Sequence, residues 1–298
     1  MSNRLVNTVK CVWETRAILG EGPLHDPRNE RLYWVDIKGE KLFAMSLRDD
    51  KKQTWSVPGN ISALGLHSDG GLVAVGRLGF CHITFDENEM PLIKYLNDPE
   101  NHIEKTRFND GAVDPYGYFW AGTMDDAEVD SEAGNWWRYA PSGQVEKMAS
   151  GFHVTNGPVF DAERKIAYLT DSARQIIYRA DYLNASSFGE LAVFKQFGRS
   201  EGYPDGMAID REGTLWVAFW DGSCLRRIST DGEVIETVKV PVKRPTCPVI
   251  IGDKIYVTSA SIGLEGKKNV LAGSLFEIAL RSNIGLDRTD YFALKRSR

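Results

Sequence analysis

The sequence is poor in cysteine and has no long apolar segment. Its four cysteines, Cys11, Cys81, Cys224 and Cys247, lie far apart, and none forms a close pair at metal-ligand or redox spacing. We therefore expect four free thiols in a reducing cytoplasm. No apolar stretch approaches the roughly 18 residues of a membrane-spanning helix, and residues 1–10 have no apolar signal core. We expect neither a membrane span nor an export signal.

An excess of charge of one sign is also missing. The 36 Lys and Arg against 41 Asp and Glu leave a formal net charge of −5, and no Lys/Arg-rich run occurs. Nucleic acid and membranes are therefore not expected as partners, and nothing implies an obligate protein partner. With 42% hydrophobic and 26% charged residues over 298 positions, the chain has ordinary globular proportions and can build its own core.

Glycine and aromatic residues are what the chain does have, with 28 Gly, 8 Trp and 11 Tyr. This composition favours many short strands over long helices. A short apolar segment that ends in a small or acidic residue recurs at residues 32–36, 72–75, 119–122, 167–170, 215–218 and 255–258. The aligned positions in these segments are Tyr33, Val73, Trp120, Tyr168, Trp216 and Tyr256, separated by 40, 47, 48, 48 and 40 residues. Such a spacing suits four short strands with their turns.

The repeat predicts an all-β fold, a six-bladed β-propeller with four antiparallel strands per blade. Turn-forming residues precede each aligned segment, and a second apolar-aromatic segment follows it. Because composition does not change along the chain, we expect a single domain over residues 1–298, with residues 1–10 as an N-terminal tail that need not be ordered. A strand near Val12 and Trp13 is expected to pair with the last blade and close the ring.

The innermost strand of each blade lines the central channel, so one repeat position samples the channel wall across all blades. Eleven or twelve residues before the aligned positions stand Glu21, Ile61 or Ser62, Asn109, Asn156, Asp205, and Arg244 or Pro245. Four of the six blades thus offer a carboxylate or an amide, each followed by Gly or Asp-Gly, which permits a sharp turn. Each residue alone could be an ordinary turn residue. Four at one repeat phase favour a shared site at one end of the axis.

Two carboxylates and two amides in one pocket need a compensating charge, because like charges repel and buried carboxylates need a partner. A divalent cation supplies that charge. Since the set offers oxygen and neither His nor Cys, Ca²⁺, Mg²⁺ or Mn²⁺ is favoured, and Zn²⁺ or Fe²⁺ is less suited to these ligands.

Five short motifs stand in chain order at blade spacing: Gly20–Pro23, Arg107–Gly111, Ala121–Met124, Asn156–Pro158 and Pro204–Met207. Together they resemble the SMP-30/gluconolactonase family, also called regucalcin-like lactonases, over about residues 11–280. The resemblance implies a six-bladed propeller that hydrolyses sugar lactones with a divalent metal at the channel mouth. It implies ligand roles for Glu21, Asn156 and Asp205. It implies substrate contacts for Arg107 and Asn109.

The chain departs from the family at one position. Some relatives place a substrate-contacting Glu shortly after the Gly-Thr-Met motif, and this chain has Ala127 there. Either Asp125, Asp126 or Glu128 replaces it or this specificity contact is absent, and Glu128 is included among the expected substrate-binding residues. The sugar preference of those relatives therefore does not carry over to this chain.

A lactone is an ester, so its hydrolysis needs a polarised carbonyl, an activated water and a stabilised oxyanion. The chain has no Gly-x-Ser-x-Gly sequence, and none of its five His stands beside a plausible nucleophilic Ser. We therefore expect metal-assisted attack of water and no acyl-enzyme. Asp205 is the candidate general base, with a metal-bound hydroxide as the alternative.

Two other functions are compatible with a propeller. One is a non-catalytic protein-interaction propeller, whose channel position need not collect oxygen ligands. The other is a propeller metal hydrolase that acts on an apolar lactone or a phosphotriester. A pocket with Arg107, Asn109 and several acids favours a polyhydroxylated substrate over an apolar one, because a guanidinium and an amide suit hydroxyl groups.

Overall fold

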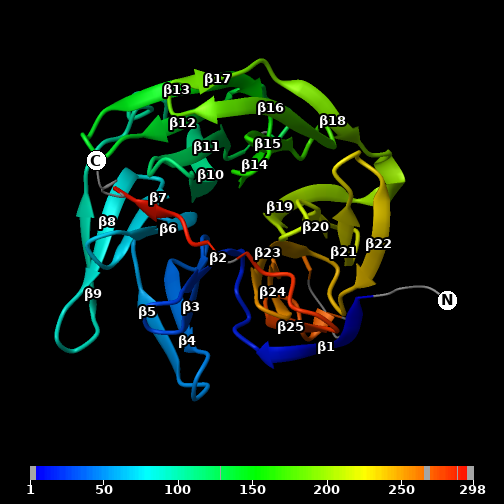
Figure 1. Ribbon diagram of the computed structural model, residues 1–298. Coiled ribbons are helices and arrows are strands. Elements are labelled where there is room, and N and C mark those ends of the chain that lie inside the picture. The colour runs from blue at the N-terminus through cyan, green and yellow to red at the C-terminus, as the bar shows by residue number, and fades with distance from the viewer. Residues whose placement is uncertain (1–4, 128, 265–268, 287, 294–298) are drawn as a thin grey trace.

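The computed structural model describes residues 5–127, 129–264, 269–286 and 288–293. Six antiparallel sheets are arranged in a ring around a central axis (Figure 1). The described residues contain the short 3₁₀ turn η1 (Arg199–Glu201) and no α-helix, and none of them belongs to a helix suited to crossing a membrane. The predicted six-bladed all-β propeller is confirmed.

Each blade runs from an inner strand at the axis to an outer strand at the rim. The inner strands are β2 (Gly20–Asp26), β6 (Ala63–His67), β10 (Thr106–Val113), β14 (Thr155–Asp161), β19 (Tyr203–Ile209) and β23 (Pro245–Ile251). The second strands are β3 (Arg31–Asp36), β7 (Leu72–Gly76), β11 (Phe119–Asp125), β15 (Ile166–Asp171), β20 (Leu215–Trp220) and β24 (Lys254–Ser259). These second strands contain the six apolar segments of the repeat.

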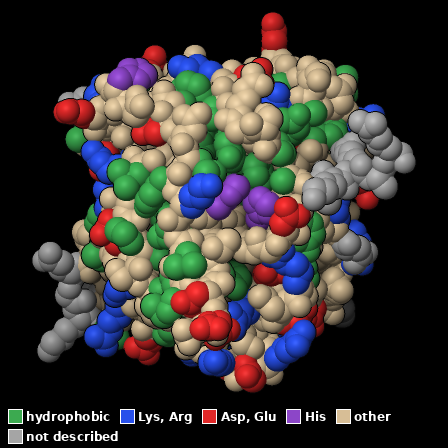
Figure 2. Space-filling view, turned by 90° about the vertical axis from the view of Figure 1, so that its left-hand side faces the viewer, with side chains coloured by type: hydrophobic (Ala, Val, Ile, Leu, Met, Phe, Trp, Pro, Cys, Tyr) green, Lys and Arg blue, Asp and Glu red, His purple; other side chains and the backbone are tan. Residues whose placement is uncertain are grey.

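The outer half of each blade completes the sheet. The third strands are β4 (Lys41–Ser46), β8 (Gly79–Phe85), β12 (Gly134–Tyr139), β16 (Ile176–Asn184), β21 (Cys224–Ile228) and β25 (Leu275–Leu280). The outer strands are β5 (Lys52–Ser56), β9 (Pro91–Tyr95), β13 (Val145–Phe152), β18 (Ala192–Gln196), β22 (Val234–Lys239) and β1 (Val6–Trp13). On the face turned to the viewer in Figure 2, acidic and basic side chains are interspersed, in line with the balanced charge of the sequence.

Two sheets have an additional strand beyond the predicted four. A short strand, β17 (Ser187–Phe188), pairs with β16, and β26 (Tyr291–Phe292), near the C-terminus, adds in parallel to inner strand β6. In Figure 1 this red C-terminal segment runs across one end of the ring. Its backbone bonds, from the Ser68 amide to the Phe292 carbonyl and from the Ala293 amide to the Gly117 carbonyl, tie it to two neighbouring blades.

The ring is closed by the N-terminal strand. β1 is the outer strand of the last blade, where Trp13 lies opposite Leu275 and Val6 opposite Leu280. The predicted pairing near Val12 and Trp13 is therefore present. It begins earlier than expected, because residues 6–10, assigned to a tail from the sequence, belong to β1.

Two blades each have a turn of the same kind, in which an aspartate anchors a buried tryptophan. Asp114 accepts hydrogen bonds from the backbone amides of Tyr116 and Tyr118, and its second oxygen accepts one from the Trp120 indole at 2.9 Å. Asp210 does the same for the amides of Glu212 and Thr214 and for Trp216 at 3.1 Å. The aspartate therefore fixes both the hairpin turn and the strand that follows it.

The core lies between the faces of adjacent blades. All six aligned residues of the repeat are at most 4% exposed, and Trp120 and Trp216 are fully buried. At the closure, the Trp13 ring packs edge-on against Trp34 with centroids 5.1 Å apart, so that β1 contributes to the core of two blades. Burying large aromatic side chains makes this interface a main source of stability.

We predict that deleting residues 1–13 lowers the unfolding free energy by at least about 3 kcal/mol, because several apolar side chains lose their burial together with a strand ladder. Thermal unfolding followed by circular dichroism measures the change. Deleting residues 1–4 alone leaves β1 complete and is the control. Equal melting temperatures for the two truncations would mean that β1 does not hold the ring closed.

Candidate functional site

Irregular strand starts distinguish one end of the channel. Five of the six inner strands have a register shift against their second strand near their first residues, typical of a β-bulge. The shifts lie between Glu21 and Leu24, Phe108 and Asp110, Asn156 and Val159, Pro204 and Met207, and Pro245 and Pro248. A bulge turns a side chain away from the regular alternation of a strand. The repeat phase selected from the sequence coincides with these bulges.

The structure brings the predicted ligand residues to this end of the channel. Glu21, Asn156 and Asp205 are 6%, 2% and 6% exposed, and each begins the inner strand of a different blade. The six inner strands contact one another in a closed ring, so their first residues surround one axis. Burial, and after it repulsion from Asp205 and Asp110, raises the pKa of Glu21 well above its ordinary value. Burial and repulsion from Asp110 likewise raise the pKa of Asp205.

A third carboxylate, Asp110, belongs to this cluster and was not a candidate from the sequence. It is 5% exposed, and burial raises its pKa to about 7. Hydrogen bonds from the Gly111 and Gly157 amides act in the opposite sense and lower the pKa. Burial, followed by repulsion from Asp110, Glu21 and Asp205, also raises the pKa of the Cys247 thiol. The sequence feature that could have identified Asp110 as a site residue is its position next to Asn109 in Asn-Asp-Gly. The site therefore holds three carboxyl groups.

None of these three carboxylates forms an ion pair with another described residue, although Arg107 is close enough to lower the pKa of Glu21. Among the described residues, no three His, Cys, Asp or Glu side chains are arranged to hold a metal ion. The expected ligand set is of another kind, two carboxylates with the Asn156 amide. Buried like charges without a cationic partner are unfavourable, and a divalent cation would balance them, so these residues fit the expected metal.

Arg107 and Asn109 are connected to the expected ligands by hydrogen bonds. The Arg107 Nη1 donates to Asn109 Oδ1 at 2.8 Å, and Asn109 Nδ2 contacts the Thr155 carbonyl at 2.8 Å and Asn156 Oδ1 at 3.3 Å. Asn156 in turn donates to the Ser172 hydroxyl at 2.8 Å. The amide of Asn109 therefore orients both Arg107 and Asn156.

Asp126 is the carboxylate that meets Arg107, at 2.6 Å from Nε. Of the three residues named from the sequence to replace the Glu missing at Ala127, Asp125 is 2% exposed and pairs with Lys105, and Glu128 lies outside the described residues. Asp126 is partly open, with 24% of its side chain exposed. Its contact with Arg107 links the turn after β11 to the start of β10, and this pair was not predicted from the sequence.

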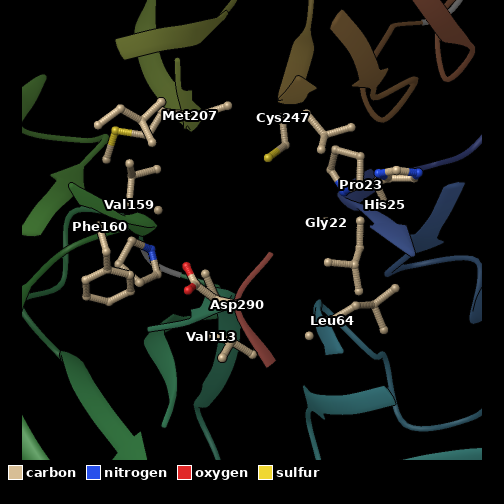
Figure 3. A pocket seen from close by; sticks show the side chains of 18 of the residues that line it. Gly22, Pro23, His25, Leu64, Val113, Val159, Phe160, Met207, Cys247 and Asp290 are labelled. Atoms are coloured by element: carbon tan, nitrogen blue, oxygen red, sulfur yellow. The ribbon is translucent and has the colours of Figure 1, made fainter. Parts of the chain in front are cut away.

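A cavity of about 280 Å³ continues along the channel beyond the carboxylates (Figure 3). Its wall is made mostly of apolar residues of the inner strands, among them Leu64, Val159 and Met207. The C-terminal segment lines it too, and Figure 3 shows the Asp290 carboxylate directed toward the central space. Polar groups are thus concentrated at the end where the inner strands begin, the end suited to a polar substrate.

A second cavity, of about 600 Å³, adjoins Arg107 between the second and third blades. Arg77, Thr106 and Thr123 line it together with Arg107 and the buried Glu100. One Glu100 oxygen accepts hydrogen bonds from Thr123, Asn135 and Trp137. The network fixes the wall of the cavity behind Arg107.

Comparisons with known proteins agree with this arrangement. The model of the SMP-30/gluconolactonase/LRE-like region matches residues 19–261. A relative from Pseudomonas putida, named 6-deoxy-6-sulfogluconolactonase, is 33% identical over 257 residues, which cover 85% of this chain and 87% of the relative. Regucalcin from Gallus gallus is 31% identical over 282 residues, covering 91% and 93%.

Among solved structures, a calcium-binding protein, regucalcin from Agrobacterium tumefaciens, superposes with a TM-score of 0.87 at 28% identity, covering 96% of this chain and 98% of that one. The family match spans well over half of the chain and includes Glu21, Arg107, Asn109, Asn156 and Asp205. The chain belongs to the SMP-30/gluconolactonase/LRE-like family.

Proposed function

We propose that this protein hydrolyses a sugar lactone, an aldonolactone, to the corresponding sugar acid with the help of one divalent cation held by Glu21, Asn156 and Asp205. The observation that carries the proposal is the buried cluster of carboxylates at the polar end of the channel, with Arg107 and Asn109 beside it. Family membership and the names of two relatives, 6-deoxy-6-sulfogluconolactonase and regucalcin, support it.

The bound cation would supply a Lewis acid for the lactone carbonyl and a lower pKa for a nearby water. Ca²⁺, Mg²⁺ and Mn²⁺ suit a set of carboxylate and amide oxygens, and the relatives named as regucalcin or as a calcium-binding protein support a divalent ion. Burial of Glu21 and Asp205 makes them strong ligands once the charge of the ion offsets their repulsion.

Hydrolysis joins the oxygen of one water to the carbonyl carbon and breaks the bond from that carbon to the ring oxygen. We assign Asp205 as the base that takes a proton from the attacking water and then passes it to the ring oxygen, which leaves as a hydroxyl. Such transfer requires hydrogen-bond distance between base and water, which a carboxylate at the end of the channel can provide.

Arg107 is suited to bind the sugar. Its Nε and Nη1 are held by Asp126, the Phe108 carbonyl and Asn109, whereas Nη2 has no hydrogen-bond partner among the described residues. A guanidinium fixed on two sides presents the remaining N–H groups in one direction. Asn109 contributes chiefly by holding Arg107 and Asn156 in place, and its Oδ1 retains capacity to accept a sugar hydroxyl.

We predict that protein stripped with a chelator loses lactone hydrolysis and regains it when Ca²⁺, Mg²⁺ or Mn²⁺ is added separately. A pH-stat assay on gluconolactone and xylonolactone measures this, and an acyl-homoserine lactone and paraoxon serve as comparison substrates. Preferred turnover of the apolar compounds would indicate another propeller hydrolase. A protein that turns over none of the four substrates under any ion condition would be better described as an interaction propeller.

We predict that Asp205→Asn abolishes both cation binding and turnover. The metal-free variant should be at least as stable as the metal-free parent, because one of three mutually repelling buried charges is removed. Calorimetric titration with Ca²⁺ or Mn²⁺, thermal unfolding and the lactone assay measure these effects. Asp231→Asn, which removes the same charge from an exposed turn of the same blade, is the matched control. Full cation binding by Asp205→Asn would refute the ligand assignment.

We predict that Arg107→Ala lowers kcat/KM about tenfold to hundredfold while cation affinity is retained, since loss of a charge-assisted contact amounts to about 1.5–3 kcal/mol. Steady-state kinetics and cation titration on the same preparation separate the two effects. Unchanged kinetics would place Arg107 outside substrate contact. An equal loss of cation affinity would instead reveal a positioning role, transmitted through Asn109 to Asn156.

A further inference from the structure

Three cationic side chains converge on one carboxylate at the polar end of the channel. Asp126 Oδ1 lies 2.7 Å from Lys38 Nζ and 2.6 Å from Arg107 Nε, and Asp126 Oδ2 lies 3.0 Å from Arg77 Nη1. Lys38 comes from the first blade, Arg77 from the second, and Arg107 and Asp126 from the third. We call Lys38, Arg77, Arg107 and Asp126 the mouth cluster.

Topology places the mouth cluster at the same end as the carboxylates. Lys38 follows β3, whose last residue, Asp36, pairs with Gly20 at the start of an inner strand. Asp126 follows β11, whose last residue, Asp125, pairs with Thr106 at the start of another. Arg77 directly follows β7, which runs in the same sense. All these turns open toward the end where the expected ligands stand.

The mouth cluster has more positive charge than its own carboxylate balances. Three cations face one anion, and they repel one another: Arg77 is among the groups that lower the pKa of Arg107, and the acids that act on Arg107 in the opposite sense are Asp126 and Glu21. Because a cation bound at the expected ligands would neutralise Glu21, Asp126 would remain the acid that faces the three cations. One cation paired with Asp126 would suffice to hold the turn after β11 in place.

The cluster also keeps hydrogen-bond donors available. Lys38 has Asp126 as its one hydrogen-bond partner among the described residues, although an ammonium has three donors. Arg77 uses Nη1 for Asp126 and Nη2 for the Glu104 carbonyl, which leaves Nε without a described partner. The side chains of Lys38 and Arg77 are 31% and 41% exposed. Arg77 and Arg107 also line the 600 Å³ cavity, together with Asp98, Glu100 and Glu104, whereas Lys38 and Asp126 are not among its lining residues.

Hydrogen bonds link the mouth cluster to the reacting end of the site. Arg107 contacts both Asp126 and Asn109, and Asn109 contacts Asn156. A substrate whose carbonyl lies at the expected cation would therefore direct its other end past Arg107 toward Lys38 and Arg77.

We propose that Lys38 and Arg77 bind an anionic group at the end of the sugar lactone remote from the reacting carbonyl, so that the preferred substrate is an acidic sugar lactone. The inference rests on the proposed function for the position of the carbonyl. Phosphate, sulfonate and carboxylate share the required chemistry, since each offers charged oxygens to an ammonium and a guanidinium. Asp126 holds the two cations in position, with its oxygens already occupied by them.

The test compares glucono-1,5-lactone with its 6-phosphate, its 6-deoxy-6-sulfonate and the corresponding 6-carboxylate lactone on metal-loaded protein. We expect at least one acidic lactone to have a kcat/KM about tenfold or more above that of the neutral one, an advantage that shrinks as salt increases because exposed charges are screened. The preferred anion identifies which of the three groups the site takes. A neutral lactone that is turned over as well as all three acidic ones would overturn the inference and leave the proposed function intact.

Variants of the two cations test their assignment. Lys38→Gln and Arg77→Gln should each lower the acidic-to-neutral ratio of kcat/KM by about three- to tenfold, the range for a partly exposed charge-assisted contact. Arg77→Lys should restore part of the ratio if charge is what matters. Lys94→Gln, which removes an exposed lysine from the outer strand of the second blade, should leave the ratio at its parental value. Ratios unaffected by both Gln variants would overturn the assignment.

Binding of the products gives a readout that does not require turnover. Calorimetry should show at least one of 6-phosphogluconate, 6-deoxy-6-sulfogluconate and glucarate binding about tenfold more tightly than gluconate, and Lys38→Gln should reduce this difference. Tight binding of the phosphorylated acid without hydrolysis of any lactone would refute the proposed function and retain the anion site. Gluconate that binds as tightly as all three acidic products would refute the anion site.

Discussion

Closing six sheets into a ring forces the first residues of all inner strands to one end of one axis. Residues that are 47 to 49 positions apart, such as Asn109, Asn156 and Asp205, lie at one end of one axis because the inner strands contact one another in a closed ring, in which β1 pairs with the last blade. The site therefore depends on the closure, and not on any local segment. Aromatic packing at the closure, where Trp13 meets Trp34, and buried aromatic residues between blades stabilise a geometry that the polar site itself does not favour.

Three buried carboxylates at the end of the channel oppose folding in the absence of a cation. Burial raises the pKa of Glu21, Asp205 and Asp110, and repulsion from neighbouring carboxylates raises that of Glu21 and Asp205 further, as expected where buried acids lack a positive partner. Bulges at the starts of five inner strands make the arrangement sterically feasible, because a regular strand would alternate these side chains between the two faces of its sheet. The carboxylates that would bind a cation thus lower the stability of the fold, as is usual at functional sites.

The three cations of the mouth cluster lie at the same end of the channel as these acids. Arg107 connects the two zones, since it contacts Asp126 on one side and Asn109 on the other. An inner ring of acids and an outer group of cations give the opening a polarity that a small polar molecule with one acidic end would match. The cavity beyond the acids, which the C-terminal segment also lines, has a mostly apolar wall, with Asp110, Arg288 and Asp290 among its charged residues.

The sequence by itself determined the six-bladed fold, the strand at the closure and the repeat phase of Glu21, Asn109, Asn156 and Asp205, because strands and turns depend on local periodicity and recur with the blades. Only the tertiary structure decided that Asp110 joins these residues, that β1 starts at Val6, and that Asp126 is the carboxylate beside Arg107. Asp126 meets Lys38 across 88 residues and Arg77 across 49. Such contacts come from turns of different blades, whose lengths vary from one repeat to the next. They cannot be predicted from the repeat, because contacts between the turns of different blades depend on how the blades are packed in the closed ring.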